Sequence, residues 1–230
     1  MCVLNYFPSA RRWLLAAGLG LFTSLDVPRA VKAQPTNQLA SVFPLNVSLQ
    51  RIEGQSRRHF TERCSAFFVG FDNREAILIS AWHCIDGEIS FQRQPSVYVR
   101  GQWVEVTIMD SGNSMDKDWL VISAPGTPFS SLTPIEISRR SVVDSESLVA
   151  IGWGRHDQRI DTEPDVVECP VMAVDTSLTL RCRLTKGDSG GVVARQLNNG
   201  ELEAVGVISS GDSIATTFAF PLDRLPLRLD

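Results

Sequence analysis

The sequence predicts an all-β protein made of antiparallel barrels, and three observations lead to this fold class. Short runs rich in β-branched and aromatic residues recur along the chain, as is typical of strands. Turn signals containing glycine, asparagine or aspartate separate these runs. Few stretches show the periodicity of an amphipathic helix. Short strands joined by turns favour antiparallel barrels over a fold that needs long helices.

Nine strands are expected, in chain order. They cover residues 65–70, 76–81, 97–108, 119–123, 148–153, 166–174, 190–195, 204–209 and 217–220. The sequences Phe-Asp-Asn-Arg at 71–74 and Asn-Asn-Gly at 198–200 are typical of hairpin turns. Residues 124–134 hold three prolines and a glycine, which indicates a connection between two halves of the chain.

The N-terminus has the pattern of a signal peptide. Arg11 and Arg12 precede an apolar stretch at residues 13–22, and Val31 and Ala33 are small residues at the positions that a signal peptidase reads. The apolar stretch is too short to cross a hydrocarbon layer of about 30 Å. We therefore expect residues 1–33 to be removed, giving a secreted or periplasmic protein without a membrane anchor.

Charge limits the partners of the mature chain. Removing the signal peptide takes away four basic residues and one acidic residue, which shifts the formal net charge from −4 to about −7. An acidic chain without basic clusters is a poor candidate for binding nucleic acid. The chain that remains is long enough for one large β domain or two small barrels.

Cysteine usage agrees with export. Cys2 leaves with the signal peptide, and the mature chain keeps four cysteines: Cys64, Cys84, Cys169 and Cys182. An even number in an exported protein predicts disulfides, although three pairings are possible and the spacing does not choose among them. The spacing lacks a close Cys-x-x-Cys pair, which argues against zinc. No metal or cofactor is expected.

Three side chains have the chemistry of a nucleophilic hydrolase. Ser189 lies in Gly-Asp-Ser-Gly-Gly at 187–191, and His83 precedes a cysteine. Asp118 opens an apolar run, whereas its neighbour Asp116 has no such run directly behind it. A serine hydroxyl needs a base within hydrogen-bond reach and a third group that orients the base. We predict His83, Asp118 and Ser189 as the catalytic residues.

The order of these residues discriminates between classes of serine hydrolase. An α/β-hydrolase elbow requires a histidine after the serine, but His59, His83 and His156 all precede Ser189. A subtilisin-like order could use Asp72, yet that fold needs long helices between its strands. The remaining order, histidine then aspartate then serine, is that of chymotrypsin.

On these motifs the chain resembles the trypsin/chymotrypsin-like serine endopeptidases. Ser-Ala-Trp-His-Cys at 80–84 is similar to the family's Thr-Ala-Ala-His-Cys, and residues 187–191 match its Gly-Asp-Ser-Gly-Gly. Asp118 with its apolar followers is similar to the family's Asp-Ile-Ala-Leu-Leu. Weaker similarities lie at Gly-Trp-Gly, 152–154, and at Gly-Val-Ile-Ser-Ser-Gly, 206–211.

The resemblance implies two antiparallel six-stranded β-barrels with the active site in the cleft between them. We expect residues 34–130 to form the first barrel, with His83 and Asp118, and residues 131–230 to form the second, with Ser189. It also implies disulfides between Cys64 and Cys84 and between Cys169 and Cys182.

The implied activity is peptide-bond hydrolysis through an acyl-enzyme, by a monomer acting on proteins or peptides. The glycines around Ser189 let bare N–H groups approach a substrate carbonyl, so the N–H groups of Gly187 and Ser189 are the predicted oxyanion hole. Ser209, Ser210 and Gly211 are the predicted substrate-binding strand.

Departures from the family keep two alternatives open. Arg183 stands where the family sets the charge of its specificity pocket, and is therefore a candidate substrate-binding residue. Thr185 replaces an expected cysteine, and no Ile-Val-Gly-Gly activation terminus precedes Cys64. These departures favour, as one alternative, a weakly active or inactive protease-like binding module. A serine esterase on the same scaffold is the other, since acyl chemistry is shared.

Overall fold

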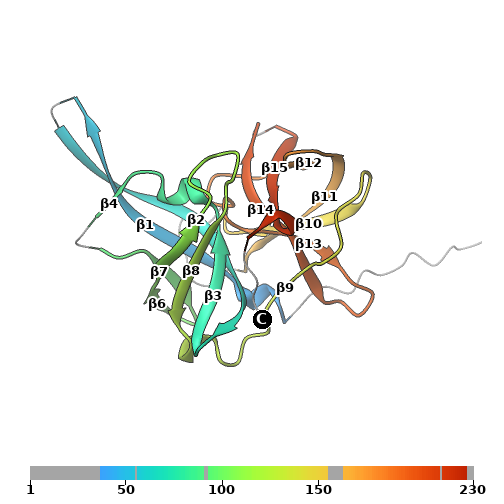
Figure 1. Ribbon diagram of the computed structural model, residues 1–230, viewed down its shortest axis with the longest axis horizontal. Helices are drawn as coiled ribbons and strands as arrows, with labels where there is room; N and C mark the ends of the chain where they lie inside the picture. The colour runs from blue at the N-terminus through green and yellow to red at the C-terminus, as the bar shows by residue number, and fades with distance from the viewer. Residues whose placement is uncertain (1–36, 55, 91–92, 155–162, 213, 227–230) are drawn as a thin grey trace, which may run out of the picture. The chain divides into compact units, whose positions relative to one another are not determined.

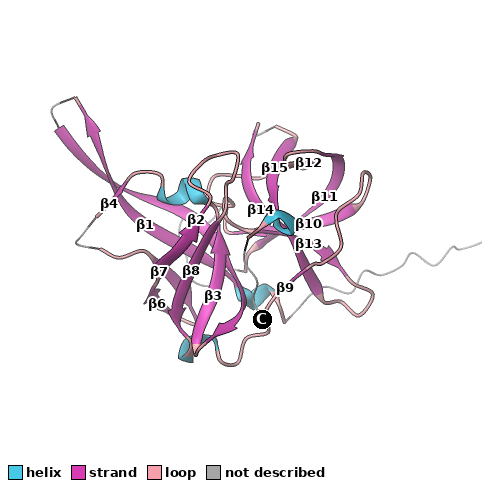
Figure 2. Ribbon diagram, viewed as in Figure 1, coloured by secondary structure: helices cyan, strands magenta, loops and turns pink. Residues whose placement is uncertain are grey.

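The computed structural model describes residues 37–54, 56–90, 93–154, 163–212 and 214–226. The predicted signal peptide and His156 lie outside the described residues. The described chain is almost entirely β, as predicted (Figures 1 and 2). Its helices are 3₁₀ turns of three or four residues: η1 (Leu39–Ser41), η2 (Trp82–Ile85), η3 (Thr127–Phe129) and η4 (Leu222–Arg224). No helix in these ranges has the length and apolar character needed to span a bilayer.

The first sheet has eight strands and carries the segments of His83 and Asp118. They are β1 (Val42–Glu53), β2 (Ser56–Asp72), β3 (Glu75–Ser80), β4 (Glu88–Ile89), β5 (Ser96–Val99), β6 (Gln102–Glu105), β7 (Thr107–Ser111) and β8 (Leu120–Pro125). Their order is β6-β5-β1-β2-β3-β8-β7, with β4 paired to β1. The end strands β6 and β7 do not pair, but only Val106 separates them in the chain. The sheet therefore curls back on itself, and its two edges meet through the chain.

The second sheet has seven strands and closes into a barrel. They are β9 (Glu136–Ile137), β10 (Ser147–Gly152), β11 (Asp165–Val174), β12 (Leu178–Arg181), β13 (Val192–Gln196), β14 (Leu202–Gly211) and β15 (Thr216–Pro221). The order is β13-β10-β11-β12-β15-β14, and a further pairing of β13 with β14 closes the ring of six, to which β9 is added. The six-stranded barrel expected for this half is therefore present, whereas the first half is a curled eight-stranded sheet.

The predicted turns join the strands where they were expected. Asn73 and Arg74, both with positive φ, link β2 to β3, and Gly200 with φ +85° lies between β13 and β14. The predicted single strand at 97–108 is instead three strands. Arg100 and Gly101, with φ of +48° and +88°, form a two-residue hairpin turn between β5 and β6.

Apolar residues from both sheets hold the two halves together. One buried cluster fills the first sheet and continues into the second through residues such as Val149, Ile151 and Val192. A smaller cluster, with Leu148, Leu178 and others, fills the second barrel. Because one core spans both sheets, the positions of their loops are coupled.

Both disulfides implied by the family resemblance are formed. Cys64 on β2 bonds to Cys84 on η2, and Cys169 bonds to Cys182. In the chain-entropy model, closing the first loop of 20 residues stabilises the fold by roughly 3 kcal/mol. This bond also ties the residue beside His83 to β2.

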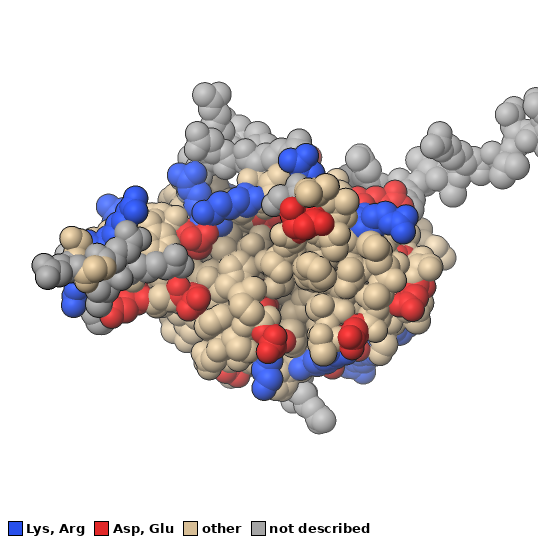
Figure 3. Space-filling model, turned by 90° about the horizontal axis from the view of Figure 1, so that it is seen from above, with Lys and Arg blue, Asp and Glu red and all other residues tan. Residues whose placement is uncertain are grey.

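Charged side chains of both signs are spread over the surface. On the face drawn in Figure 3, the described acidic and basic residues are interspersed around the margin, and uncharged residues form the centre. A partly buried ion pair joins Arg195 of β13 to Glu146. This guanidinium lowers the pKa of the Glu146 carboxyl.

Candidate active site

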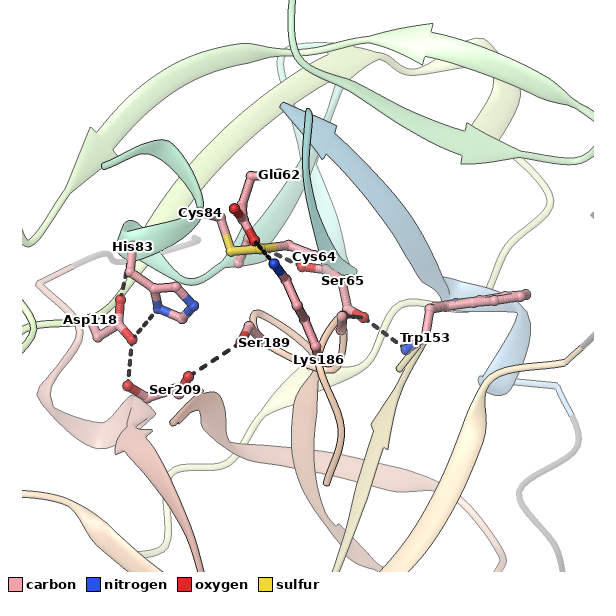
Figure 4. The surroundings of a disulfide bond; sticks show 12 residues. Glu62, Cys64, Ser65, His83, Cys84, Asp118, Trp153, Lys186, Ser189 and Ser209 are labelled. Carbon is pink, nitrogen blue, oxygen red and sulfur yellow. Dashed lines mark hydrogen bonds and ion pairs between the residues drawn. A yellow bond between two sulfur atoms is a disulfide. The ribbon is translucent and has the colours of Figure 1, made fainter. Parts of the chain in front are cut away.

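His83 lies on η2, immediately after strand β3. The 3₁₀ turn places its imidazole over the edge of the first sheet, and the disulfide of the next residue, Cys84, anchors the turn to β2. The His83 side chain is 24% exposed. Figure 4 shows the imidazole between Asp118 and Ser189.

Asp118 is buried directly before strand β8, with only 1% of its side chain exposed. Its carboxylate lies against three hydrogen-bond donors. The backbone N–H of His83 donates to Oδ1 at 2.9 Å, and His83 Nδ1 lies 2.8 Å from Oδ2. The hydroxyl of Ser209 donates to Oδ2 as well. These bonds compensate for the burial of a charged carboxylate.

This arrangement favours one tautomer of His83. An ionised carboxylate only accepts hydrogen bonds, so the tautomer that suits this contact carries its proton on Nδ1 and donates to Asp118. In the neutral ring the lone pair then lies on Nε2, on the side away from Asp118. The contact with buried Asp118 therefore fixes the orientation of the His83 ring.

Ser189 lies in the tight turn that precedes β13. Its hydroxyl donates to the Ser209 carbonyl at 3.3 Å, which is long for a hydroxyl donor. In the described structure no hydrogen bond joins Ser189 to His83. The backbone of the turn is held more tightly, because Ser189 O accepts from Ser65 N at 2.7 Å.

The turn leaves two amide groups without acceptors. The N–H groups of Asp188, Gly190 and Gly191 donate to backbone carbonyls at 2.8–3.1 Å. Those of Gly187 and Ser189 donate to no acceptor that the structure describes. Gly187 has φ +105° and Gly190 φ +80°, conformations that favour glycine. The two amides predicted as the oxyanion hole are thus available to a ligand.

Asp188 is buried, and its carboxylate accepts hydrogen bonds from Thr185. Oδ2 accepts from Thr185 N at 2.7 Å and from Thr185 Oγ1 at 3.2 Å, whereas buried Oδ1 accepts from no described group. Burial raises the pKa of the Asp188 carboxyl, and the bonds from Thr185 offset part of the rise. A Cβ at Gly152 would lie 2.7 Å from Oδ1, and one at Gly154 would lie 2.3 Å from Oδ2. The Gly-Trp-Gly sequence therefore leaves room for this carboxyl group.

Two hollows flank the β14 segment that follows Ile208. A hollow of about 170 Å³ lies beside Ser189 and is lined by Leu184, Ile208 and Thr217 among others. A larger one, of about 790 Å³, lies beyond Ser209 and Ser210 and is lined by Trp119, Phe218 and Arg224 among others. The first hollow borders Ser189 and the second borders Asp118.

Of the residues predicted to bind substrate, only some line the hollow beside Ser189. Ser210 and Gly211 are exposed and line the hollow beside Ser189, together with Ser209. Arg183 is exposed and is not among the residues that line that hollow. Lys186 lines the hollow. Its side chain is 84% exposed, and its Nζ lies 3.7 Å from Glu62 Oε1. The hollow therefore does not take its charge from Arg183.

Cys64, Cys84 and His83 place potential ligand atoms within 4.8 Å of one another. However, both sulfur atoms belong to the disulfide and are not thiolates. A thiolate is the form in which cysteine binds metal. The cluster is thus better suited to positioning His83 than to holding an ion.

Contacts of two serines were not predicted from the sequence. Ser209 is predicted to bind substrate, and in the structure its hydroxyl also donates to Asp118 and its carbonyl accepts from Ser189. Ser65 was predicted only as the start of a strand, yet it contacts the Ser189 turn. Neither hydroxyl has a local sequence signal that indicates its partner.

Comparison with known proteins identifies the family of the chain. Residues 32–222 match the family model described as Trypsin. The chain belongs to the trypsin family. By family, this trypsin-like chain is a serine endopeptidase, a hydrolase whose substrates are proteins or peptides. A search of curated proteins finds no match.

Solved structures of serine proteases share the trypsin-like fold. The thermostable serine protease AL20, from an extremophilic microorganism, is 16% identical with a TM-score of 0.57, over 79% of this chain and 91% of that chain. The active form of the Rv3671c protease of M. tuberculosis is 16% identical with a TM-score of 0.57, over 80% and 77%. The protease Anisep of Arthrobacter nicotinovorans is 13% identical with a TM-score of 0.60, over 80% and 91%. At these identities the similarity concerns the fold.

Proposed function

We propose that this trypsin-like chain cleaves peptide bonds with a triad of His83, Asp118 and Ser189, through an acyl-enzyme. The observation that carries the proposal is the buried Asp118, whose Oδ2 lies 2.8 Å from His83 Nδ1. A carboxylate in this position orients the imidazole and stabilises its protonated form. The reactive nitrogen of His83 then faces the turn that carries Ser189 (Figure 4).

In the first half of the reaction, Ser189 Oγ leaves the Ser209 carbonyl and donates to His83 Nε2. The Ser189 oxygen attacks the scissile carbonyl carbon while His83 takes its proton. When the C–N bond breaks, His83 returns this proton to the leaving amine. The product is an ester between the acyl part of the substrate and Ser189.

In the second half, water takes the place of the amine. His83 removes a proton from the water as its oxygen attacks the ester carbon, and Ser189 leaves with that proton. Both halves pass through a tetrahedral carbon with a negatively charged oxygen. We assign the free N–H groups of Gly187 and Ser189 to this oxygen, because donors aimed at developing charge lower the barrier.

The substrate is proposed to lie along Ser210 and Gly211. Both exposed residues of β14 line the hollow of about 170 Å³, and Ser210 also lines the larger one, so a side chain next to the scissile bond enters the smaller hollow. Residues further upstream reach the hollow of about 790 Å³ beside Asp118. Arg183 is left out of this proposal because it lines neither hollow.

We also propose that the protein is exported as a monomer and loses residues 1–33. The two disulfides support export, since disulfides persist in oxidising compartments. The proposed mature chain divides into halves at 34–130 and 131–230. Expression with secretion should yield a protein that begins at Gln34, as determined by N-terminal sequencing and intact mass. An N-terminus at Met1 in the exported protein would contradict the proposal.

Labelling with a fluorophosphonate tests the nucleophile. The wild type should be labelled at one serine, and Ser189→Ala should lose both labelling and peptide hydrolysis, because the only activated hydroxyl is gone. Ser209→Ala is a useful comparison, since it should slow labelling without abolishing it. A wild type that is not labelled would favour the binding-module alternative. Turnover of simple esters without turnover of a peptide library would favour the esterase.

A further inference from the structure

Ser65 is the first residue after Cys64 on β2, and its side chain is completely buried. Its hydroxyl donates to the carbonyl of Gly187 at 2.8 Å and accepts from the backbone N–H of Trp153 at 2.9 Å. Its own backbone N–H donates to the carbonyl of Ser189 at 2.7 Å. One residue therefore contacts the Ser189 turn twice and the 152–154 segment once; Figure 4 shows the contact with Trp153.

The two contacts hold the peptide groups that follow the proposed oxyanion-hole residues. The bond to Gly187 O orients the peptide between residues 187 and 188, and the bond to Ser189 O orients the peptide between 189 and 190. The N–H groups of Gly187 and Ser189 belong to the peptide groups just before these two, and they remain without an acceptor in the described structure. Gly187, with φ +105°, has no side chain that would resist rotation of its peptide groups.

Ser65 also connects this turn to the histidine. Cys64 is bonded to Cys84, the residue after His83, so the strand that holds the turn is the strand that anchors the base. The carbonyl of Ser65 accepts from the buried hydroxyl of Ser80 at 2.7 Å, which fixes the peptide plane of Ser65 itself. A side chain placed this way acts on the geometry of the site without touching substrate.

We propose that the Ser65 hydroxyl is a positioning group, which keeps the turn in the conformation with the N–H groups of Gly187 and Ser189 free. This inference rests on the proposed function, because it assigns those two groups to the negatively charged oxygen. Without the hydroxyl, the Gly187 carbonyl loses the donor at 2.8 Å and the part-buried Trp153 N–H loses the acceptor at 2.9 Å. Peptide rotation at Gly187 then competes with the arrangement that binds the oxyanion.

The test compares Ser65→Ala with Ser41→Ala. Ser41 is equally buried, and its hydroxyl also donates to a backbone carbonyl, Thr133 O, at 2.6 Å, but it lies on η1 away from the site. Ser65→Ala loses two hydrogen bonds of its hydroxyl and Ser41→Ala loses one, so both should melt somewhat lower than the wild type. Ser65→Gly, which removes the same hydroxyl, serves if Ser65→Ala does not fold.

We expect Ser65→Ala to lower kcat about tenfold or more, below the hundredfold typical of losing an oxyanion donor outright. KM should change little, because the lost interaction acts in the transition state. The inhibition constant of a peptide aldehyde, which forms a tetrahedral adduct, should rise by about the factor by which kcat/KM falls. Ser65→Thr, which keeps the hydroxyl, should recover most of the activity, and Ser41→Ala should retain it.

Three results would overturn the inference. A Ser65→Ala variant that matches Ser41→Ala in kcat and aldehyde inhibition would show that the hydroxyl only stabilises the fold. A loss confined to KM would place its effect on substrate binding instead. A wild type without fluorophosphonate labelling would remove the proposed function and this inference together, whereas the first two results leave the proposed function standing.

Discussion

Asp118→Asn should reduce kcat by about 10⁴-fold while the protein remains folded. An amide at this position can donate to His83 Nδ1, which lies 2.8 Å from Oδ2 in the wild type. The imidazole would then carry its proton on Nε2 and could not accept one from Ser189. Steady-state hydrolysis of a peptide and the rate of fluorophosphonate labelling should fall together, because both require the same base.

The matched control is Asp116→Asn. Asp116 is two residues away and exposed, whereas Asp118 is buried. We expect kcat of this variant to stay within the order of magnitude of the wild type. A large loss in Asp116→Asn together with an active Asp118→Asn would assign the orienting carboxylate to Asp116. Circular dichroism of both variants establishes that the fold is retained.

Gly190→Ala should abolish activity and destabilise the fold. A Cβ at this position would lie 2.2 Å from Ser80 Oγ and 2.3 Å from the Ser65 carbonyl oxygen. Positive φ adds about 1–2 kcal/mol for a residue with a Cβ, and overpacking in a filled core adds a further 1–3 kcal/mol or so. We therefore expect a loss of about 3 kcal/mol in the free energy of unfolding, measured by urea denaturation.

Gly101→Ala separates the two causes. Gly101 has φ +88°, close to the +80° of Gly190, but no atom lies within 4 Å of its Cβ position. This variant should lose only the conformational contribution, about 1–2 kcal/mol, and keep its activity. Equal destabilisation by the two substitutions would show that the tight contact with Ser80 and Ser65 is relieved by small movements of the backbone.

Many of the strands were predictable because apolar and polar residues alternate along a strand that has one buried face. In β1, Leu45, Val47 and Leu49 are buried and alternate with Asn46 and Ser48. The sequence analysis nevertheless left this segment without a strand, although its pattern was sufficient. Strand β1 could therefore have been predicted from its alternating pattern.

The error at 97–108 has a different origin. The turn between β5 and β6 uses Arg100 at φ +48°, and arginine is rarely found in this conformation. Asparagine, aspartate or glycine is usual at both central positions of such a turn, and here only Gly101 is one of these residues. The number of strands in the first sheet was therefore not predictable from turn chemistry.

The candidate site also has one part that the sequence predicts and another that it does not. The residue types and order of His83, Asp118 and Ser189 were readable because acyl chemistry requires a base, an acid and a nucleophile. The hydroxyl of Ser209, which reaches Asp118 across 91 residues, was not readable. Serine is common in strands and loops, and a hydroxyl can point in several directions. Its partner depends on the rotamer and on how the sheets pack.

The sequence by itself determined the chemical groups, the β class of the fold and the family to which the motifs are similar. Only the tertiary structure decided which groups meet, such as Ser65 with Gly187, 122 residues away. Local patterns follow from the period of a strand, which a few neighbouring residues reveal. Contacts between distant segments follow from the summed packing of two sheets in one core, and no short stretch of sequence contains that information.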